Sequence, residues 1–454
     1  MGNIELREPA VHVPRQAPEL RRDSALTVLP GYFLYCLFHI VLLPYLLVNA
    51  ARRLIQNPNR KYREGALARL LGGCRPPRKG RWVVIVGTGL GEARTALLAA
   101  EEIEETRHSD VAVWVKFGRV LRLADGANRP FPVGLAPYNN PVSALIALAR
   151  WRPRAIIFVE NADNLHLAVL ARLLGVKTLL ANVNISERRA RRYSRRPLGV
   201  WRIRAAGPIA TQGDKPSRRL AQIGVPADQI LVSGPVMPEP VPDEEKSLKR
   251  KKWRQILSLD GSPTPVVVAG STHKDEERAV LESFMEFRNG YPSALLILAP
   301  RYPFRKGGAD SVLRETGTAF ARRSQLNGEL PASGVVLLDT EGELREVYSV
   351  ATVAFVGGSL TPKPGGHTPV EPLAWGVPIT IGPHYGQQEA VVSACADAGV
   401  LSVCSTPDEL ARSWAAWTDD DQARDELRRR STRLMQRRRE VFQTWYDLLF
   451  SVED

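Results

Sequence analysis

The chain of 454 residues contains 44% apolar and 24% charged residues, a composition typical of globular proteins, and its length suits two domains with separate cores. This composition excludes a largely disordered chain and a membrane protein with many spans. Lys and Arg (62) outnumber Asp and Glu (48), so the formal charge of +14 favours an anionic partner, such as nucleic acid, phospholipid or a phosphorylated substrate.

The N-terminal region begins with a polar, proline-containing tail, residues 1–24, which we expect to be disordered. Residues 25–51 then lack Asp, Glu, Lys and Arg, and as one helix they would reach roughly 40 Å, more than the ~30 Å hydrocarbon core of a bilayer. Arg52 and Arg53 follow at once, which predicts that the rest of the chain lies on the cytoplasmic side. Two prolines and a histidine in this segment leave two arrangements open, a span or a kinked helix within one leaflet. A buried soluble helix is disfavoured because no polar face interrupts the run.

Residues 52–240 alternate short apolar segments with amphipathic helical patterns. Apolar strands separated by helices predict a parallel sheet with helices on both faces. The expected strands lie at residues 82–86, 111–115, 155–159, 177–183, 207–212 and 229–234. A proline-rich and then highly charged stretch ends this domain, and residues 241–261 are expected to form the linker and the helix that enters a second domain.

The same pattern restarts in residues 262–418, where strands are expected at 264–270, 294–300, 334–340, 350–358, 378–382 and 399–404. Residues 419–454 are expected to form an arginine-rich C-terminal helix. The predicted fold class is therefore α/β, with a membrane-associated segment followed by two doubly wound, Rossmann-like domains. We expect these domains to face a cleft, where open α/β sheets bind ligands at the carboxyl ends of their strands.

A glycine-containing turn, VGTGLGEAR at residues 86–94, follows the first strand and opens a helix. It has the look of a dinucleotide-binding turn, but Glu92 occupies the position of the third glycine and would repel a pyrophosphate, which disfavours NAD. A carboxylate at the start of a helix and the carboxyl end of a strand is instead a candidate general base. The alternative, a first-turn glutamate that merely complements the helix dipole, stays equally open.

The second domain has a similar layout after its first strand, where Ser271, Thr272 and His273 precede a helix. Hydroxyls and free backbone N–H groups at this place can hold a phosphate, although a serine or threonine here is also an ordinary N-cap. Arg301 and Arg305 follow the next strand. Cations at that edge of the sheet suit the phosphate of a nucleotide.

A second glycine-rich segment, GGHTPVEPLAWGVPITIGPH, spans residues 365–384. Thr368, the following proline and Glu371 have the spacing of a capping box with proline at the first helical position, which is a sufficient structural reason for the glutamate. Glu371 could equally accept hydrogen bonds from ribose hydroxyls. Capping does not explain Gly365, Gly366 and His367, and the glycine pair would let the backbone approach a ligand closely.

Several segments taken together resemble one family. In chain order they read GLGE, NVNISERRARRY, GSTHKDEE, PRYPFR, and FVGGSL followed by GGHTPVEPLAWGVPITIGPH, all behind an apolar N-terminal segment. From about residue 25 onward the chain resembles the Kdo transferases of lipopolysaccharide synthesis, which are inverting glycosyltransferases of the GT-B fold that use CMP-Kdo. The resemblance implies CMP-Kdo as donor, a phosphorylated lipid A precursor as acceptor, and a location at the cytoplasmic face of the inner membrane.

The resemblance also implies roles for residues at matching positions. Glu92 would be the general base that deprotonates the acceptor hydroxyl, and Glu371 would contact the ribose. The implied nucleotide-sugar residues are Ser271, Thr272, Arg301, Gly357, Gly358, Ser359, Gly366, His367, Thr368 and Glu371. The implied acceptor residues are Glu160, Ser186, Glu187 and Arg188. We expect no cofactor and no metal, because helix dipoles and cations can stabilise the leaving phosphate and because the four cysteines show no metal-ligand spacing.

The chain departs from the family pattern mostly in its first domain. Residues 85–90 read IVGTGL where the family has His-Ala-x-Ser-Val, and residues 159–167 read VENADNLHL where it has Glu-Thr-Glu, an apolar residue and Trp-Pro-Asn. In the second domain Thr368 replaces an asparagine and Tyr302 replaces a histidine. These differences bear chiefly on the sugar acceptor.

Arginines at positions 188–196 form a basic cluster that we expect to meet an anionic membrane surface, where each cation contributes on the order of 1 kcal/mol. Nucleic acid is the rival partner, but few aromatic residues interleave the arginines, so we expect no nucleic-acid binding. Two other functions stay open. One is a GT-B transferase or epimerase that uses another nucleotide sugar such as a UDP-sugar, and the other is an inactive GT-B-like membrane scaffold.

Overall fold

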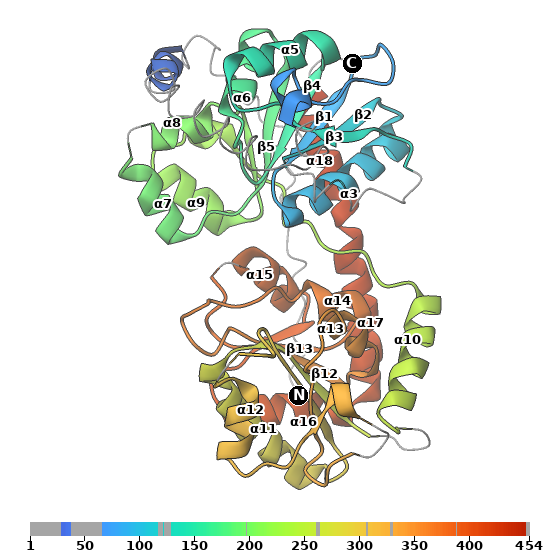
Figure 1. Ribbon diagram of the computed structural model, residues 1–454. Coiled ribbons are helices and arrows are strands. Elements are labelled where there is room, and N and C mark those ends of the chain that lie inside the picture. Colours follow the sequence, from blue (N-terminus) through green and yellow to red (C-terminus); the bar gives the residue numbers. More distant parts are fainter. Residues whose placement is uncertain are drawn as a thin grey trace. The chain divides into compact units, whose positions relative to one another are not determined.

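The computed structural model describes residues 29–37, 66–116, 121, 129–196, 198–259, 264–305, 307–326, 330–386 and 388–450. The chain forms two compact units (Figure 1). Unit 1 comprises Met1–Val236 and Arg439–Asp454, and unit 2 comprises Met237–Arg438. Each unit is built around one seven-stranded sheet whose neighbouring strands all run parallel. The predicted α/β class with two parallel-sheet domains is confirmed.

The sheet of unit 1 has the strand order β3-β2-β1-β4-β5-β6-β7. Its central strands are apolar and buried along their whole length, as expected for strands with helices on both faces. The strands are β1 (Val83–Gly87), β2 (Val111–Val115), β3 (Val133–Leu135), β4 (Ala155–Val159), β5 (Lys177–Val183), β6 (Ile209–Thr211) and β7 (Ile230–Val232).

The helices of unit 1 enclose a separate apolar cluster on each face of this sheet. On one face Trp151 packs edge-on against Trp82 and Trp114, with ring centroids 5.3 and 5.5 Å apart. On the other face α3 and α18 share one cluster with β1, β2 and β4. The helices are α3 (Leu90–Arg107), α5 (Pro141–Trp151), α6 (Leu165–Leu173), α7 (Glu187–Ser194), α8 (Gly199–Arg204), α9 (Asp214–Gln222), the 3₁₀ helix η2 (Ala227–Gln229) and α18 (Arg438–Phe450).

The sheet of unit 2 has the order β10-β11-β9-β8-β12-β13-β14. Its strands are β8 (Val266–Thr272), β9 (Leu295–Pro300), β10 (Ala321–Arg322), β11 (Val335–Leu337), β12 (Val353–Val356), β13 (Ile379–Ile381) and β14 (Leu401–Val403). Its helices are α10 (Asp243–Ile256), α11 (Lys274–Gly290), α12 (Ala309–Glu315), η3 (Arg323–Gln325), α13 (Leu344–Val347), η4 (Tyr348–Val350), α14 (Val370–Trp375), α15 (Glu389–Asp397), α16 (Pro407–Asp419) and α17 (Asp421–Gln436).

The C-terminal region differs from the single helix expected over residues 419–454. It consists of α17 and α18, with a break at Arg437, and the two helices belong to different units. Leu427 and Leu434 of α17 are buried in a cluster of unit 2, whereas Phe442 and Trp445 of α18 are buried in unit 1. Each helix is therefore held by the apolar face of its own unit.

The predicted tail, residues 1–24, and most of the apolar segment at 25–51 lie outside the described residues. Residues 29–37 are helical. Tyr35 of this helix is buried in a cluster with Leu165, Val169 and Ala205 of unit 1. Over the parts of the chain that the structure describes, no helix combines the length and the apolar character needed to cross a membrane.

Candidate functional site

Glu92 lies where sequence reasoning expected it, in the first turn of α3 after β1. Its Oε2 accepts a hydrogen bond from the backbone N–H of Gly89 and another from Thr88 Oγ1 at 2.7 Å. Its Oε1 accepts a third hydrogen bond from Asn161 Nδ2 at 2.9 Å. Glu92 therefore caps its helix, as the structural alternative supposed, while its second oxygen is turned to a side chain that follows another strand.

Glu160 follows β4 directly and is brought near Glu92 because β1 and β4 are neighbours in the sheet. Its backbone is left-handed (φ 60°), an uncommon conformation outside glycine that is often found at functional sites. Burial, and then the negative charge of Glu92, raise the pKa of Glu160 to about 7, against the opposing effects of Arg189 and a hydrogen bond from Asn182 at 3.2 Å. Unit 1 thus holds the carboxyl groups of Glu92 and Glu160 near each other, and the pKa of Glu160 is close to neutral pH.

Two further residues complete this group: sequence reasoning did not single out Asn161, and it placed Arg189 only in the basic cluster expected to meet a membrane. Asn161 donates to Glu92, and Arg189 of α7 donates to Asn161 Oδ1, so a chain of hydrogen bonds links the arginine to the candidate base. A small cavity of about 50 Å³ beside them is lined by Glu160, Asn161, Arg189 and Tyr193 among others. The position of Asn161 directly after a candidate acid was the available signal in the sequence.

The other predicted acceptor residues lie on α7. Ser186 is the N-cap and accepts from the backbone N–H of Arg189 at 3.4 Å. Glu187 is exposed and pairs with Arg191 at 3.2 Å, and Arg188 is also exposed. Arg188 and Arg189 lie on different sides of the helix, and it is Arg189 that bonds to Asn161 and lowers the pKa of Glu160 by its charge.

In unit 2 the expected donor residues gather where β8, β9 and β12 end side by side. Ser271 has a left-handed backbone (φ 57°) at the end of β8, and Thr272 Oγ1 donates to Glu277 Oε1 at 3.2 Å. His273, and not a hydroxyl residue, is the N-cap of α11. Arg301 follows β9, and its backbone N–H donates to Thr272 O at 2.9 Å.

Glu276 organises this edge of the sheet and was not among the predicted residues. Glu276 is buried, with 1% of its surface exposed. Its two carboxylate oxygens accept hydrogen bonds from four backbone N–H groups. These come from His273 (3.0 Å), Gly358, Ser359 (3.1 Å) and Leu360 (3.2 Å). A carboxylate that accepts several backbone N–H bonds is stabilised in its charged form and fixes the loop that surrounds it.

Gly357 and Ser359 lie in the loop that Glu276 holds. A Cβ on Gly357 would come within 2.6 Å of Ser271 O and 2.7 Å of Thr272 Cα, so only glycine allows this close approach. Ser359 is fully buried, donates to Val356 O at 2.6 Å and accepts from the backbone N–H of Gly382 at 2.8 Å. The hydroxyl of Ser359 is therefore occupied by hydrogen bonds to the backbone, while Gly357 allows the loop to pack against β8.

His273 and His367 form the centre of the candidate donor site. Their Nε2 atoms lie 2.9 Å apart, and the edge of His273 also meets Tyr302, with ring centroids 5.9 Å apart. Burial, then His273 and then Arg301 lower the pKa of His367 to about 4. The uncharged imidazole of His367, together with His273 and Arg301, places hydrogen-bonding groups for an anion at this edge of the sheet.

The expected capping box at residues 368–371 is wrong. The N-cap of α14 is Pro369, no side chain caps the helix, and Thr368 Oγ1 accepts only a long 3.5 Å hydrogen bond from Val370 N. Because the helix starts one residue later than expected, Glu371 is its second residue and remains exposed. Burial and then the negative charge of Glu371 raise the pKa of Tyr348, which indicates that the two side chains are close. Helix capping therefore does not account for Glu371.

Gly366 is required by the backbone. Its φ is 82°, and a Cβ there would lie 2.9 Å from both His384 O and Tyr385 Cα. Its N–H donates to Gly358 O at 2.6 Å, which joins the two glycine-containing loops beside His367. In the described parts of both units, no group of three or more His, Cys, Asp or Glu side chains is arranged to hold a metal ion.

Comparison with known proteins identifies relatives along most of the chain. Residues 60–237 match the family model described as 3-deoxy-D-manno-octulosonic-acid transferase (kdotransferase). The 3-deoxy-D-manno-octulosonic acid transferase of Haemophilus influenzae is 31% identical over 317 residues, which cover 69% of this chain and 73% of that protein. The probable mitochondrial enzyme of the same name from Arabidopsis thaliana is 29% identical over 74% of this chain and 76% of its own length.

Solved structures with a similar fold are more distant in sequence. A glycosyltransferase from Rickettsia africae is 10% identical and has a TM-score of 0.58, covering 83% of this chain and 100% of that chain. The HepE protein of Anabaena, in complex with UDP, is 14% identical with a TM-score of 0.55, covering 82% and 100%. At this level of identity the likeness concerns the two-unit α/β fold alone.

Proposed function

Because the chain belongs to the family of 3-deoxy-D-manno-octulosonic acid (Kdo) transferases, we propose that it transfers Kdo from CMP-Kdo to a lipid A precursor in lipopolysaccharide synthesis. The observation that carries the proposal is the 31% identity to the Haemophilus influenzae transferase over 73% of that enzyme. The two parallel-sheet units fit the GT-B fold of such enzymes. The proposal makes the chain an inverting glycosyltransferase with one donor site and one acceptor site.

Glu92 is the proposed general base. Its Oε1 takes the proton of the acceptor hydroxyl. The hydroxyl oxygen of the acceptor then bonds to the anomeric carbon of Kdo, and the bond from this carbon to the CMP phosphate breaks. Two hydrogen bonds from Thr88 and Gly89 hold the other oxygen, so the reacting oxygen keeps its direction. Asn161 now donates to Oε1 at 2.9 Å, which supports this role because an acceptor hydroxyl would donate to the same oxygen.

The leaving phosphate is proposed to bind in unit 2 at the start of α11. Arg301 supplies a fixed positive charge there, and His273 and His367 supply imidazole donors. Exposed Glu371 is available for the ribose hydroxyls, since it does not cap its helix. A fixed cation and a helix N-terminus stabilise the negative charge that develops as CMP leaves, so the step needs no metal.

Membrane association is proposed to use unit 1. The helix at residues 29–37 packs with Tyr35 against Trp201 of α8, with ring centroids 6.2 Å apart, and exposes Phe33, Leu34 and Leu37 on its other side. Helix α7, which contacts α8, and the residues directly after it expose five arginines, of which Arg191 pairs with Glu187: Arg188, Arg191, Arg192, Arg195 and Arg196. An apolar face beside a basic face suits a helix in one leaflet of an anionic membrane, at the cytoplasmic face of the inner membrane.

A transfer assay tests the function. Purified protein, CMP-Kdo generated in the reaction and a lipid A precursor in detergent are incubated, and the lipid is examined by mass spectrometry. The proposal expects a mass gain of one or more Kdo units, and UDP-sugars should give none. Clear binding of CMP without any mass gain would point to a different acceptor or to an inactive scaffold.

Glu92→Gln isolates the base. The amide keeps an oxygen for the helix cap but cannot take a proton, so the rate should fall by about 10²- to 10⁴-fold while CMP binding is unchanged. Glu105→Gln is the matched control, because Glu105 is an exposed residue of the same helix. A Glu92→Gln rate equal to that of the control would remove Glu92 from the mechanism.

A further inference from the structure

Unit 2 contains a large polar pocket at the amino-terminal edge of its sheet, opposite to the edge that carries the candidate donor site. It has a volume of about 520 Å³, within the range of small-molecule sites. Its wall includes the residues that lead into three strands, namely Thr264 before β8, Thr352 before β12 and Pro378 before β13. Helices α10 and α17 supply the remaining side. We call this cavity the arginine pocket.

The charge of the arginine pocket is strongly one-sided. Two carboxylates, Asp243 and Asp421, line it, and they face five cationic side chains: Lys246, Arg250, Arg254, Arg424 and Arg428. Lys246 already pairs with Asp243 at 3.1 Å, and Arg424 with Asp421. The pocket therefore holds an excess of positive charge in a confined space, where the potential acting on an anion is focused.

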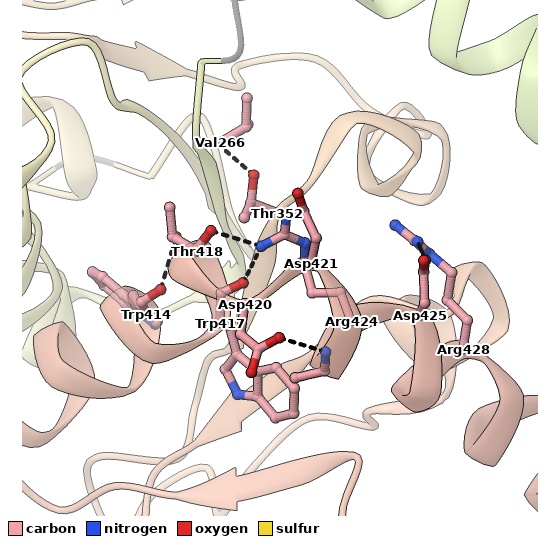
Figure 2. A network of polar contacts seen from close by, with 11 residues as sticks. Val266, Thr352, Trp414, Trp417, Thr418, Asp420, Asp421, Arg424, Asp425 and Arg428 are labelled. Atoms are coloured by element: carbon pink, nitrogen blue, oxygen red, sulfur yellow. Dashed lines mark hydrogen bonds and ion pairs between the residues drawn. The ribbon is translucent and has the colours of Figure 1, made fainter.

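Part of this basic wall is fixed by the fold. Arg424 donates to the backbone carbonyls of Trp417 and Thr418, the latter at 2.8 Å, and Arg428 pairs with Asp425 (Figure 2). Arg254, in the last turn of α10, donates to Leu259 O in the segment that follows the helix. These guanidinium groups are held in place before any ligand arrives, which lowers the entropy lost on binding.

Arg250 differs from the others. Among the residues that the structure describes, no hydrogen-bond acceptor or carboxylate partners its guanidinium. The residue as a whole is exposed, yet partial burial of its guanidinium and the like charges of Arg428, Arg254 and Arg424 lower its pKa. Bringing cations together in this way is unfavourable unless an anion neutralises them. Arg250 is thus a free donor placed among fixed ones.

The same wall also contains buried polar atoms without partners. Ser349 Oγ and Trp375 Nε1 make no hydrogen bond among the described residues, although both residues are more than nine-tenths buried and line the pocket. Tyr348, Val350 and Val377 add an apolar side. Arginines opposite an apolar and aromatic wall fit a phosphate and leave an apolar surface for an organic group attached to it.

We propose that the arginine pocket is a second binding site, separate from the donor site, for a ligand that carries a phosphate group. Arg250 and Arg428 bind the phosphate oxygens, and planar guanidinium groups suit this role because each can donate two parallel hydrogen bonds. The same chemistry is offered by a soluble phosphate ester and by a phospholipid head group. The experiment separates these two sources.

Inorganic pyrophosphate is the probe for the soluble source, titrated by calorimetry at fixed ionic strength. Arg250→Gln and Arg428→Gln should each weaken binding about tenfold or more, because each removes charge-assisted hydrogen bonds. Lys251→Gln and Arg429→Gln are the matched controls. Lys251 is the exposed neighbour of Arg250 on α10, and Arg429 pairs with Glu426 as Arg428 does with Asp425, but neither lines the pocket. Both controls should bind within about twofold of the unchanged protein.

Co-sedimentation with vesicles tests the lipid source, comparing phosphatidic acid in phosphatidylcholine with phosphatidylcholine alone. Phosphatidic-acid binding that weakens in both pocket variants and stays unchanged in both controls would assign a lipid head group, since all four variants retain the membrane-binding surface proposed for unit 1. Loss of pyrophosphate binding alone would assign a soluble phosphate ester. An equal loss of ligand binding in all four variants would overturn the proposal, because general positive charge would then explain the binding. Unchanged binding in Arg250→Gln and Arg428→Gln would also overturn it, because the ligand would then bind elsewhere, such as at the donor site. Circular dichroism of each variant verifies that it is folded.

Discussion

The imidazole rings of His273 and His367 are stacked, with centroids 5.2 Å apart, planes inclined by 12° and Nε2 atoms 2.9 Å apart. At that distance one nitrogen donates and the other accepts, so the pair holds a single proton between the two Nε2 atoms. Burial and the neighbouring charges keep His367 uncharged at neutral pH, with a pKa of about 4. His367 is therefore an uncharged hydrogen-bonding group at the carboxyl edge of the unit 2 sheet.

This pair predicts a loss of stability in acid. The pKa of His367 in the folded protein, about 4, lies below its ordinary value of 6.5, so the unfolded chain takes up the proton first. The stabilisation is present above pH 6.5 and disappears as the pH falls towards 4. Since the ring is half exposed, the expected loss between pH 7.5 and pH 5 is only on the order of 1 kcal/mol. Urea unfolding of the wild type and of His367→Gln measures it. The variant should lose less stability than the wild type in acid, and His384→Gln should behave as the wild type does.

Glu160 predicts the opposite pH dependence in unit 1. Its pKa in the folded protein, about 7, lies above the ordinary 4.5, so the folded form holds the proton longer. This contribution is complete below pH 4.5 and is lost as the pH rises through 7. Glu160→Gln cannot ionise and keeps an oxygen for Asn182, so at pH 8 it should exceed the wild type in unfolding free energy, by on the order of 1 kcal/mol. The difference should vanish at pH 5. Glu187→Gln, an exposed control, should show no such crossover, and a gain for Glu160→Gln that is independent of pH would contradict the assignment.

Glu276→Ala is expected to lower the unfolding free energy of unit 2 by about 3 kcal/mol or more. In the wild type the carboxylate accepts hydrogen bonds from four backbone N–H groups at a buried place. The substitution leaves these four groups without that partner. CMP binding should weaken as well, because the loop at 357–360 loses its anchor. Glu282→Ala changes an exposed glutamate of the same helix and should stay within about 0.5 kcal/mol of the wild type. Equal stability of the two variants in denaturant titrations would show that Glu276 does not hold the loop.

Gly366→Ala places a methyl group where the backbone has φ 82° and where His384 O and Tyr385 Cα lie 2.9 Å from the new atom. The expected cost is about 1–3 kcal/mol, together with weaker CMP binding. Gly386→Ala is the matched control, since a Cβ there has no neighbour within 4 Å and the backbone lies outside the left-handed region. Thermal unfolding and CMP titration of both variants compare the two glycines directly. A Gly366→Ala protein as stable as the control would mean that the loop adapts.

The helices and strands were largely predictable because buried strands appear in the sequence as short runs of apolar residues. Each of the twelve expected strand segments overlaps a strand, and the limits of β2, β4 and β5 agree with the expected ones. The two strands that sequence reasoning missed, β3 and β10, are edge strands of three and two residues. Strands of two or three residues are shorter than the apolar runs by which a strand is recognised in a sequence.

The candidate sites were predictable only in part, for reasons of distance along the chain. Glu92 and Glu160 stand directly after strands, where pattern alone suggests a site. Glu276 looked like an ordinary helix glutamate, because its partners at 358–360 are more than eighty residues away. The capping box at Thr368 failed because the local pattern placed the helix start one residue too early.

Unit 1 is built from two separate parts of the chain, and this determines when its core can be completed during synthesis. Phe442 and Trp445 of α18 fill the apolar face formed by β1, β2 and β4, and Trp445 Nε1 donates to Ser233 Oγ at 3.1 Å. A nascent chain that ends before residue 439 exposes that face to water, however much of the sheet has formed. Unit 2 is continuous, so all of its residues leave the ribosome before this gap can be filled. The core of unit 1 is therefore completed only after all of unit 2 has been synthesised.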